Sequence, residues 1–174
     1  MGVTLVELLP KERLQPSLLD RLTDDEPEKQ AESREKRVLS MHQLRNSVLR
    51  DLAWLFNAGQ LASAQDLGGY PLVTHSVVNY GIPDLTGRTV SGMSTSAVEE
   101  ALRQAIVDFE PRIQRETLQV RAPLTPEAAD RNAVAFEVEG ELWGQPVTSR
   151  IYLRTEIDLD SGQISVAERA GASV

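Results

Sequence analysis

The chain has 174 residues, of which 41% are hydrophobic and 25% are charged, the composition of a single globular domain and not of a disordered chain. Lys and Arg total 18 against 26 Asp and Glu, and the net charge of −8 argues against a nucleic-acid partner. Cysteine is absent, which excludes disulfide frameworks and thiolate metal sites.

The N-terminal 40 residues carry little that could form a core. Residues 1–10 lack the basic region and cleavage site of a secretory signal, and no run in the chain approaches the roughly 20 apolar residues of a membrane helix. Residues 16–22 form a short apolar segment that could dock as one helical turn or enter a partner's groove. Residues 23–37 are almost wholly polar, as in a solvated linker or a fraying helix start. We therefore expect an extended or partly disordered arm over 1–40 and one domain over 41–170.

A helix is predicted next, because apolar residues recur at spacings of three and four and form one stripe. Asn57 and Gly59 supply its end. Turn residues follow at 67–71, then a short apolar piece at 73–80 and a second loop with Gly81, Pro83 and Gly87. The stripe consists of Leu44, Val48, Leu52, Leu55 and Phe56.

A second helix is predicted from Ser96, which matches a capping box with Glu99 three residues later. Pro111 should end this helix, because a proline biases the preceding residue, Glu110, out of the helical region. Its apolar stripe consists of Val98, Leu102, Ala105, Ile106 and Phe109.

Beyond Arg112 the apolar period changes to two, which is typical of half-buried antiparallel strands. Residues 160–162 form a tight turn between the last two strands. Helices followed by strands predict an α+β fold, with N-terminal helices packed on one face of a C-terminal antiparallel sheet. Nothing in the sequence covers the edges of that sheet, and Pro146 fits only a strand end or an edge. The alternating positions, apolar except for Ser149, are 118 and 120, then 134, 136 and 138, then 147, 149, 151 and 153, then 157 and 159, and finally 164 and 166.

Catalytic and cofactor motifs are missing from the sequence. His42 and His75 lack zinc-type spacing, and no nucleophile elbow, dinucleotide fingerprint or phosphate loop occurs, so we expect neither a metal nor a cofactor. Among 26 acids some pair will always lie at a separation suitable for glycoside cleavage, which makes that pattern uninformative. Glu110 is the best single acid, but Arg112 would pair with it and favour its charged form, whereas a general acid needs the opposite.

Four strings in chain order resemble the TssE family of type VI secretion baseplate proteins, which is similar to the small wedge subunit of phage contractile tails. The resemblance spans most of the chain, and four ordered matches are far more specific than one. Phe56 is a modest departure, since a second aliphatic residue is commoner there. The strings are residues 17–22 (SLLDRL), 48–57 (VLRDLAWLFN), 77–87 (VVNYGIPDLTG) and 109–113 (FEPRI).

The resemblance implies a structural, non-enzymatic role in the cytoplasm, in a baseplate docked at the inner membrane complex and without membrane insertion. The implied partners are the wedge proteins TssF and TssG and the contractile sheath proteins TssB and TssC. Sheath subunits of such machines link by exchanging strands, and an exposed sheet edge would accept one by strand addition.

The resemblance also places a partner contact at Glu110, Pro111 and Arg112, where a rigid proline beside an acid and a guanidinium would make a specific, charge-assisted surface. An internal ion pair closing the helix–strand junction is the equal alternative for these residues. For residues 79–87 a turn packed on the core is preferred. Trp54 is expected in the core, with Arg50 and Asp51 as a local pair.

Two other functions are alternatives to the baseplate role. Some phage relatives are called lysozymes, which makes a peptidoglycan hydrolase one alternative, although the sequence adds only its supply of acids. The other alternative is a generic α+β binding module of another pathway.

Overall fold

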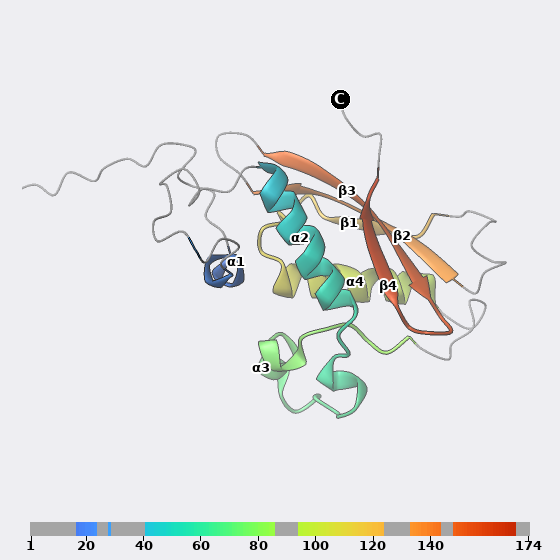
Figure 1. The fold of residues 1–174 in the computed structure, drawn as a ribbon. Helices are drawn as coiled ribbons and strands as arrows, with labels where there is room; N and C mark the ends of the chain where they lie inside the picture. Colours follow the sequence, from blue (N-terminus) through green and yellow to red (C-terminus); the bar gives the residue numbers. More distant parts are fainter. Residues whose placement is uncertain are drawn as a thin grey trace, which may run out of the picture.

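The fold consists of helices followed by a four-stranded sheet (Figure 1). The computed structural model describes residues 17–23, 28, 41–85, 94–123, 133–143 and 148–169. The elements are α1 (Leu18–Leu22), α2 (Met41–Phe56), η3 (Leu61–Ser63), α3 (Pro71–Thr74), η4 (Val77–Asn79), α4 (Thr95–Phe109), β1 (Gln119–Arg121), β2 (Ala133–Leu142), β3 (Ser149–Asp158) and β4 (Ile164–Glu168).

The sheet is antiparallel, with the strand order β1-β2-β3-β4. β2 and β3 pair along their whole length, from Ala133 opposite Asp158 to Leu142 opposite Ser149, whereas β1 and β4 are short edge strands. The two alternating patterns predicted at 147–153 and 157–159 fall largely on the single strand β3, with Leu159 just after its end and residue 147 outside the described residues. Thr155 hides this continuity in the sequence, because it is polar yet fully buried and its hydroxyl donates to the Phe136 carbonyl.

The predicted turn between β3 and β4 is confirmed. The Asp158 carboxylate accepts hydrogen bonds from the main-chain N–H groups of Asp160 and Ser161, and Gly162 takes a φ of 73°, which favours glycine.

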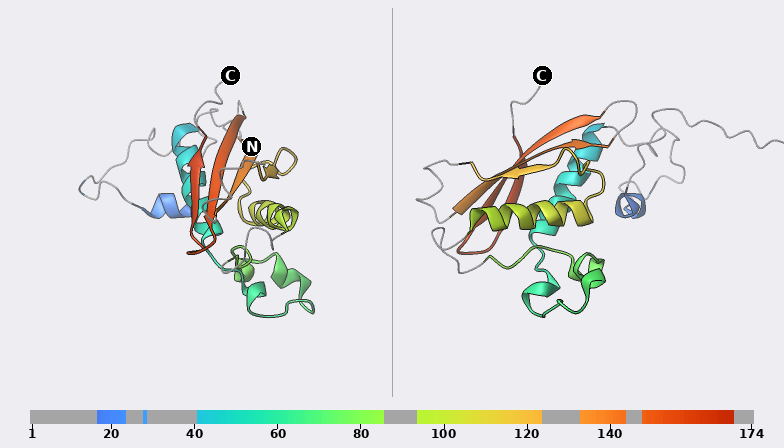
Figure 2. Two further views of the ribbon diagram at one scale, coloured as in Figure 1. Left: turned by 90° about the vertical axis from the view of Figure 1, so that its right-hand side faces the viewer. Right: turned by 180° about the vertical axis from the view of Figure 1, so that it is seen from behind.

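Helices α2 and α4 cover one face of the sheet, α2 on the side of β4 and α4 on the side of β1 (Figures 1 and 2). The apolar stripes predicted for both helices point into one core with the inward residues of β2 and β3. The α+β prediction is therefore confirmed. Within the described ranges, no helix is both long and apolar enough to cross a bilayer.

Of the predictions for the two ends of α4, one was confirmed and the other was wrong. The helix ends at Phe109 with Glu110 as its C-cap, as Pro111 predicts. The predicted capping box was wrong, because Ser94 is the N-cap and its hydroxyl accepts from the Ala97 N–H. Glu99 instead accepts a hydrogen bond from the main-chain N–H of Ala122, just after β1, at 2.6 Å.

The prediction that Trp54 lies in the core was wrong. Its side chain is 52% exposed, and the Arg50 guanidinium stacks over the indole at 5.0 Å from the ring centroid. Helical phase explains the difference, because Trp54 shares a flank of α2 with Arg50 and Asp51 and not with the stripe of Leu52 and Leu55.

The segment after α2 is closed on itself by main-chain hydrogen bonds. Gln60 donates to the Ile82 carbonyl at 3.0 Å, and Ile82 donates to the Ala58 carbonyl at 2.9 Å. Gly81, at a φ of 125°, passes so close to Ala58 that a Cβ would lie 2.3 Å from its carbonyl oxygen. Ile82 and Leu85 enter the core, which agrees with the interpretation of 79–85 as a turn packed on the domain. Residues 86 and 87 of this string, Pro146, and most of the 1–40 arm lie outside the described residues.

Candidate partner-binding site

Glu110, Pro111 and Arg112 form the junction between α4 and the sheet. The Glu110 N–H donates to the Ile106 carbonyl at 2.8 Å and so closes the last turn of α4. The chain then runs beside the end of β2, where Trp143 donates to the Arg112 carbonyl at 2.7 Å and Gln114 donates to the Glu141 carbonyl at 2.9 Å. Main-chain bonds on both sides therefore fix the position of Arg112.

Glu110 and Arg112 form an internal ion pair. The Glu110 side chain is only 3% exposed. One of its carboxylate oxygens accepts from the Arg112 Nε at 2.6 Å and from the Arg112 main-chain N–H at 3.1 Å, and the other accepts from Nη2. Burial alone would lower the pKa of Arg112, but the hydrogen bonds and charges of Glu110 and Asp51 outweigh it and raise that pKa. The guanidinium is therefore always charged.

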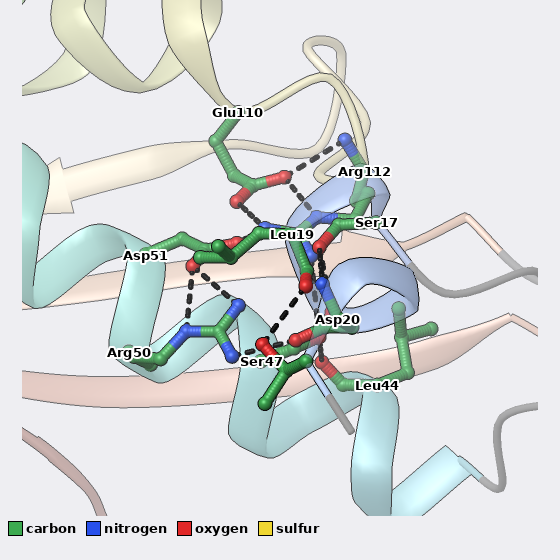
Figure 3. Close-up of polar contacts among 10 residues, drawn as sticks. Ser17, Leu19, Asp20, Leu44, Ser47, Arg50, Asp51, Glu110 and Arg112 are labelled. Carbon is green, nitrogen blue, oxygen red and sulfur yellow. Dashed lines mark hydrogen bonds and ion pairs between the residues drawn. The ribbon is translucent and has the colours of Figure 1, made fainter. Parts of the chain in front are cut away.

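Arg112 also reaches helix α2 (Figure 3). Its Nη2 lies 2.6 Å from the Asp51 carboxylate, and its Nη1 donates to the Ser47 hydroxyl at 3.2 Å. Ser47 is buried and donates in turn to the Leu44 carbonyl at 2.9 Å. One arginine thus links α2 and the end of α4.

The network continues to helix α1. Arg50 donates to Asp51 at 2.9 Å, the predicted local pair, but it also donates to Asp20 of α1 at 2.6 Å. The Ser17 hydroxyl donates to the other Asp20 oxygen at 2.7 Å. Burial would raise the pKa of Asp20, yet the hydrogen bonds from Arg50 and Ser17 lower it overall.

Polar contacts carry much of the attachment of α1 to the domain. Leu18 and Leu22 of this helix are 70% and 74% exposed, so they bury little surface on α2. The hypothesis that residues 16–22 dock as one helical turn is confirmed for Leu18–Leu22.

A pocket of about 280 Å³ opens beside the ion pair. Its apolar lining includes Leu52, Leu55 and Phe109, and Tyr80 packs edge-on against Phe109 with a centroid separation of 5.2 Å. Burial raises the pKa of Tyr80, and the negative charges of Asp51 and Glu110 add to the effect. The remaining lining residues are Ser17, Leu19, Asp51, Trp54, Glu110 and Arg112.

In this geometry the Glu110 carboxylate is already paired. Arg112 occupies both oxygens of the Glu110 carboxylate, so this acid is not free to give a proton to a substrate. In the part of the chain that is described, no cluster of three His, Cys, Asp or Glu side chains could hold a metal ion. His75 contacts Asp108 at 2.8 Å, and His42 contacts Asn46 at 3.2 Å, both on the surface.

Of the predicted site residues, Pro111 is exposed, Arg112 is 24% exposed in its side chain, and Glu110 is buried behind them. Sequence reasoning did not find Asp20, Tyr80 or Trp143 as neighbours of this site. Asp20 and Tyr80 stood inside two of the four family strings, which was the available signal.

Comparison with known proteins gives one family. The model of the baseplate wedge protein gp25 family matches residues 42–147, more than half of the chain. This range contains three of the four strings, and the resemblance to baseplate wedge proteins is thereby confirmed. No curated protein sequence matches the chain.

The chain is also similar to a solved structure from Geobacter sulfurreducens that is provisionally named a tail lysozyme. The identity is 16% and the TM-score is 0.45, over 78% of this chain and 98% of the other. That distant likeness carries no inference about activity. Because the family model matches more than half of its length, the chain belongs to the baseplate wedge protein gp25 family, whose members are structural proteins of phage-type baseplates.

Proposed function

We propose that this chain is a baseplate subunit of the TssE type in a type VI secretion system. In this role it joins the wedge proteins TssF and TssG and offers its sheet to the sheath proteins TssB and TssC, which add to it by strand pairing. It works in the cytoplasm, in a baseplate docked at the inner membrane complex. The observation that carries the proposal is the gp25 match over 42–147, to which the four TssE-like strings add the type of machine.

Within this proposal the wedge partner contacts Pro111, Arg112 and the adjoining pocket. Glu110 is too deeply buried for a direct contact, so it acts by holding Arg112 in place. A fixed guanidinium beside an apolar pocket would bind a partner that presents a carboxylate next to an apolar side chain, because a charged fork adds direction to apolar burial. The exposed Trp54 at the pocket supplies an aromatic anchor.

The test combines pull-down with TssF and TssG and imaging of labelled sheath in cells that lack the chain. Trp54→Ala and Arg112→Lys are the informative variants, because one removes the anchor and the other keeps the charge but loses the planar fork. We expect each to weaken the pull-down by roughly tenfold, with folding checked by circular dichroism.

Tyr70→Ala is the matched control, since Tyr70 is an exposed aromatic residue outside the pocket lining. It should bind the wedge proteins like the unmodified chain. Normal sheath assembly in cells without the chain would refute the proposed function. Full binding by both informative variants would refute only the assignment of the site.

A further inference from the structure

The hydrogen-bond pattern of the sheet identifies which main-chain groups face its open edges. Asp158 donates to the Gln163 carbonyl at 3.0 Å, and Arg169 donates to the Tyr152 carbonyl at 2.9 Å. In an antiparallel pair, hydrogen-bonded and non-hydrogen-bonded residue pairs alternate. Ser165 and Ala167 therefore bond inward to β3, while the N–H and C=O groups of Ile164, Val166 and Glu168 point away from β3.

The first of these outward positions is already taken by a side chain. The Asn57 amide donates to the Ile164 carbonyl at 2.8 Å and accepts from the Ile164 N–H at 2.9 Å. A neighbouring strand residue would make the same pair of bonds. Asn57 is held at the end of α2 by its own main-chain bond to the Ala53 carbonyl.

The other end of this edge is closed by Arg45 of α2. Its guanidinium donates to the Arg150 carbonyl at 2.7 Å, on the part of β3 that extends beyond β4, and also pairs with Glu168 at 3.2 Å. Between the two capped positions, the outward main-chain groups of Val166 and Glu168 make no hydrogen bond to any other described residue.

The opposite edge, β1, is less open. The same alternation, carried through β3 and β2, places the main-chain groups of Val120 and Ala122 outward from β1. The carboxylate of Glu99 already accepts from the Ala122 N–H. A helix lies beside each edge strand, α4 beside β1 and α2 beside β4, so the two edges differ in their uncapped main-chain groups and not in helix cover. Within β1, Val120 is therefore the one residue whose N–H and C=O both point outward without a cap, against Val166 and Glu168 on β4.

We propose that β4 is the edge that accepts a partner strand, and that Asn57 sets the register by excluding that strand from Ile164. The occupant is an extended segment of another polypeptide that pairs with Val166 and Glu168 through main-chain bonds. This inference rests on the proposed function, in which the partner is a sheath subunit. Because Val166 faces the core and Ser165 and Ala167 face solvent, the added segment should alternate apolar and polar residues.

Proline substitution separates the two edges. Val166→Pro removes an outward N–H without removing a bond to β3, and edge strands tolerate proline in that position. We expect it to weaken binding of purified sheath subunits to the full chain by roughly tenfold, because the added strand then keeps an unpaired acceptor. Val120→Pro makes the same change on β1 and should leave binding within about twofold of the unmodified chain.

Hydrogen exchange at single-residue resolution gives an independent readout. On binding sheath subunits, the amides of Val166 and Glu168 should become protected, while Val120 should not change. In Asn57→Ala, the Ile164 amide should lose its protection in the free chain and regain it in the complex. This readout does not depend on whether the proline variant folds.

Each outcome decides between the inference and the function on which it rests. Loss of binding in Val120→Pro alone, or new protection at Val120 alone, would show that β1 is the accepting edge. Binding that survives both proline variants without new protection on β4 would refute the inference and leave the baseplate role standing. Failure of sheath subunits to bind the unmodified chain would refute both.

Discussion

Arg112 is the side chain that joins the largest number of separate parts of the site. It binds the carboxylates of Glu110 and Asp51 and the hydroxyl of Ser47, and its carbonyl accepts from Trp143. Glu110 is buried, and Arg112 is the partner of both of its oxygens. Removal of the guanidinium would therefore leave a carboxylate in the interior without a counter-charge.

Arg112→Ala should destabilise the domain by about 3 kcal/mol, the order of magnitude for breaking a buried ion pair from one side. Urea denaturation followed by circular dichroism measures the free energy of unfolding. Arg115→Ala, an exposed arginine three residues further on, should change it by less than about 0.5 kcal/mol. A loss at Arg112 no larger than at Arg115 would contradict the structural importance of the pair.

The sequence predicted part of this network and not the rest, for a physical reason. The Glu110–Arg112 pair was foreseeable, because the two residues flank a rigid proline. The contacts of Arg112 with Asp51 and Ser47 join residues 61 and 65 positions apart, and local spacing carries no information about them. Trp54 was predicted in the core, but its phase on the helix places it beside Arg50 and outside the apolar stripe.

Helix α1 is tied to α2 by an ion pair between Asp20 and Arg50. Asp20 has a lowered pKa in the folded chain, so its contribution to docking is complete above 3.8, the ordinary pKa of an Asp side chain. As the pH falls through the lowered value, Asp20 takes up a proton and its ion pair with Arg50 is lost. We expect α1 to separate from α2 in acid.

The fluorescence of Trp54 can report this separation, because Trp54 and Leu19 of α1 line the same pocket. Trp143→Phe removes the only other tryptophan of the chain. The emission should change in a transition below pH 3.8, and Asp20→Asn should already show the changed emission at neutral pH. An identical acid transition in Asp20→Asn would rule out Asp20 as its cause.

At the level of elements, periodicity located both long helices and the strands of the sheet. It failed where a tertiary contact competes with a local one. Glu99 has the correct spacing to cap α4 from Ser96, but the unpaired N–H of Ala122 offers it a bond on the neighbouring strand. The N-cap of α4 is Ser94, two residues before Ser96. The capping-box spacing between a Ser and a Glu three residues later could not identify it.

As a whole, the molecule has the organisation of a scaffold. The ion pair of Glu110 and Arg112 fixes the junction between α4 and the sheet, and main-chain groups of Val166 and Glu168 point outward from the edge strand β4. Purified chain should therefore leave a peptidoglycan suspension as turbid as buffer does, because Glu110 is held as an ion pair and cannot act as the general acid that glycoside cleavage requires. A lysozyme of known activity serves as the positive control. Clearing by the unmodified chain that disappears in Glu110→Gln would make it an enzyme.

The bonds between α2 and β4 also bear on how the protein is made. Asn57 and Ile164 are 107 positions apart, and Arg45 and Glu168 are 123 apart. Helix α2 is translated before every strand of the sheet, so its apolar stripe has to wait for β2 and β3 to be made. The domain therefore reaches its final form only after residue 168 has left the exit tunnel.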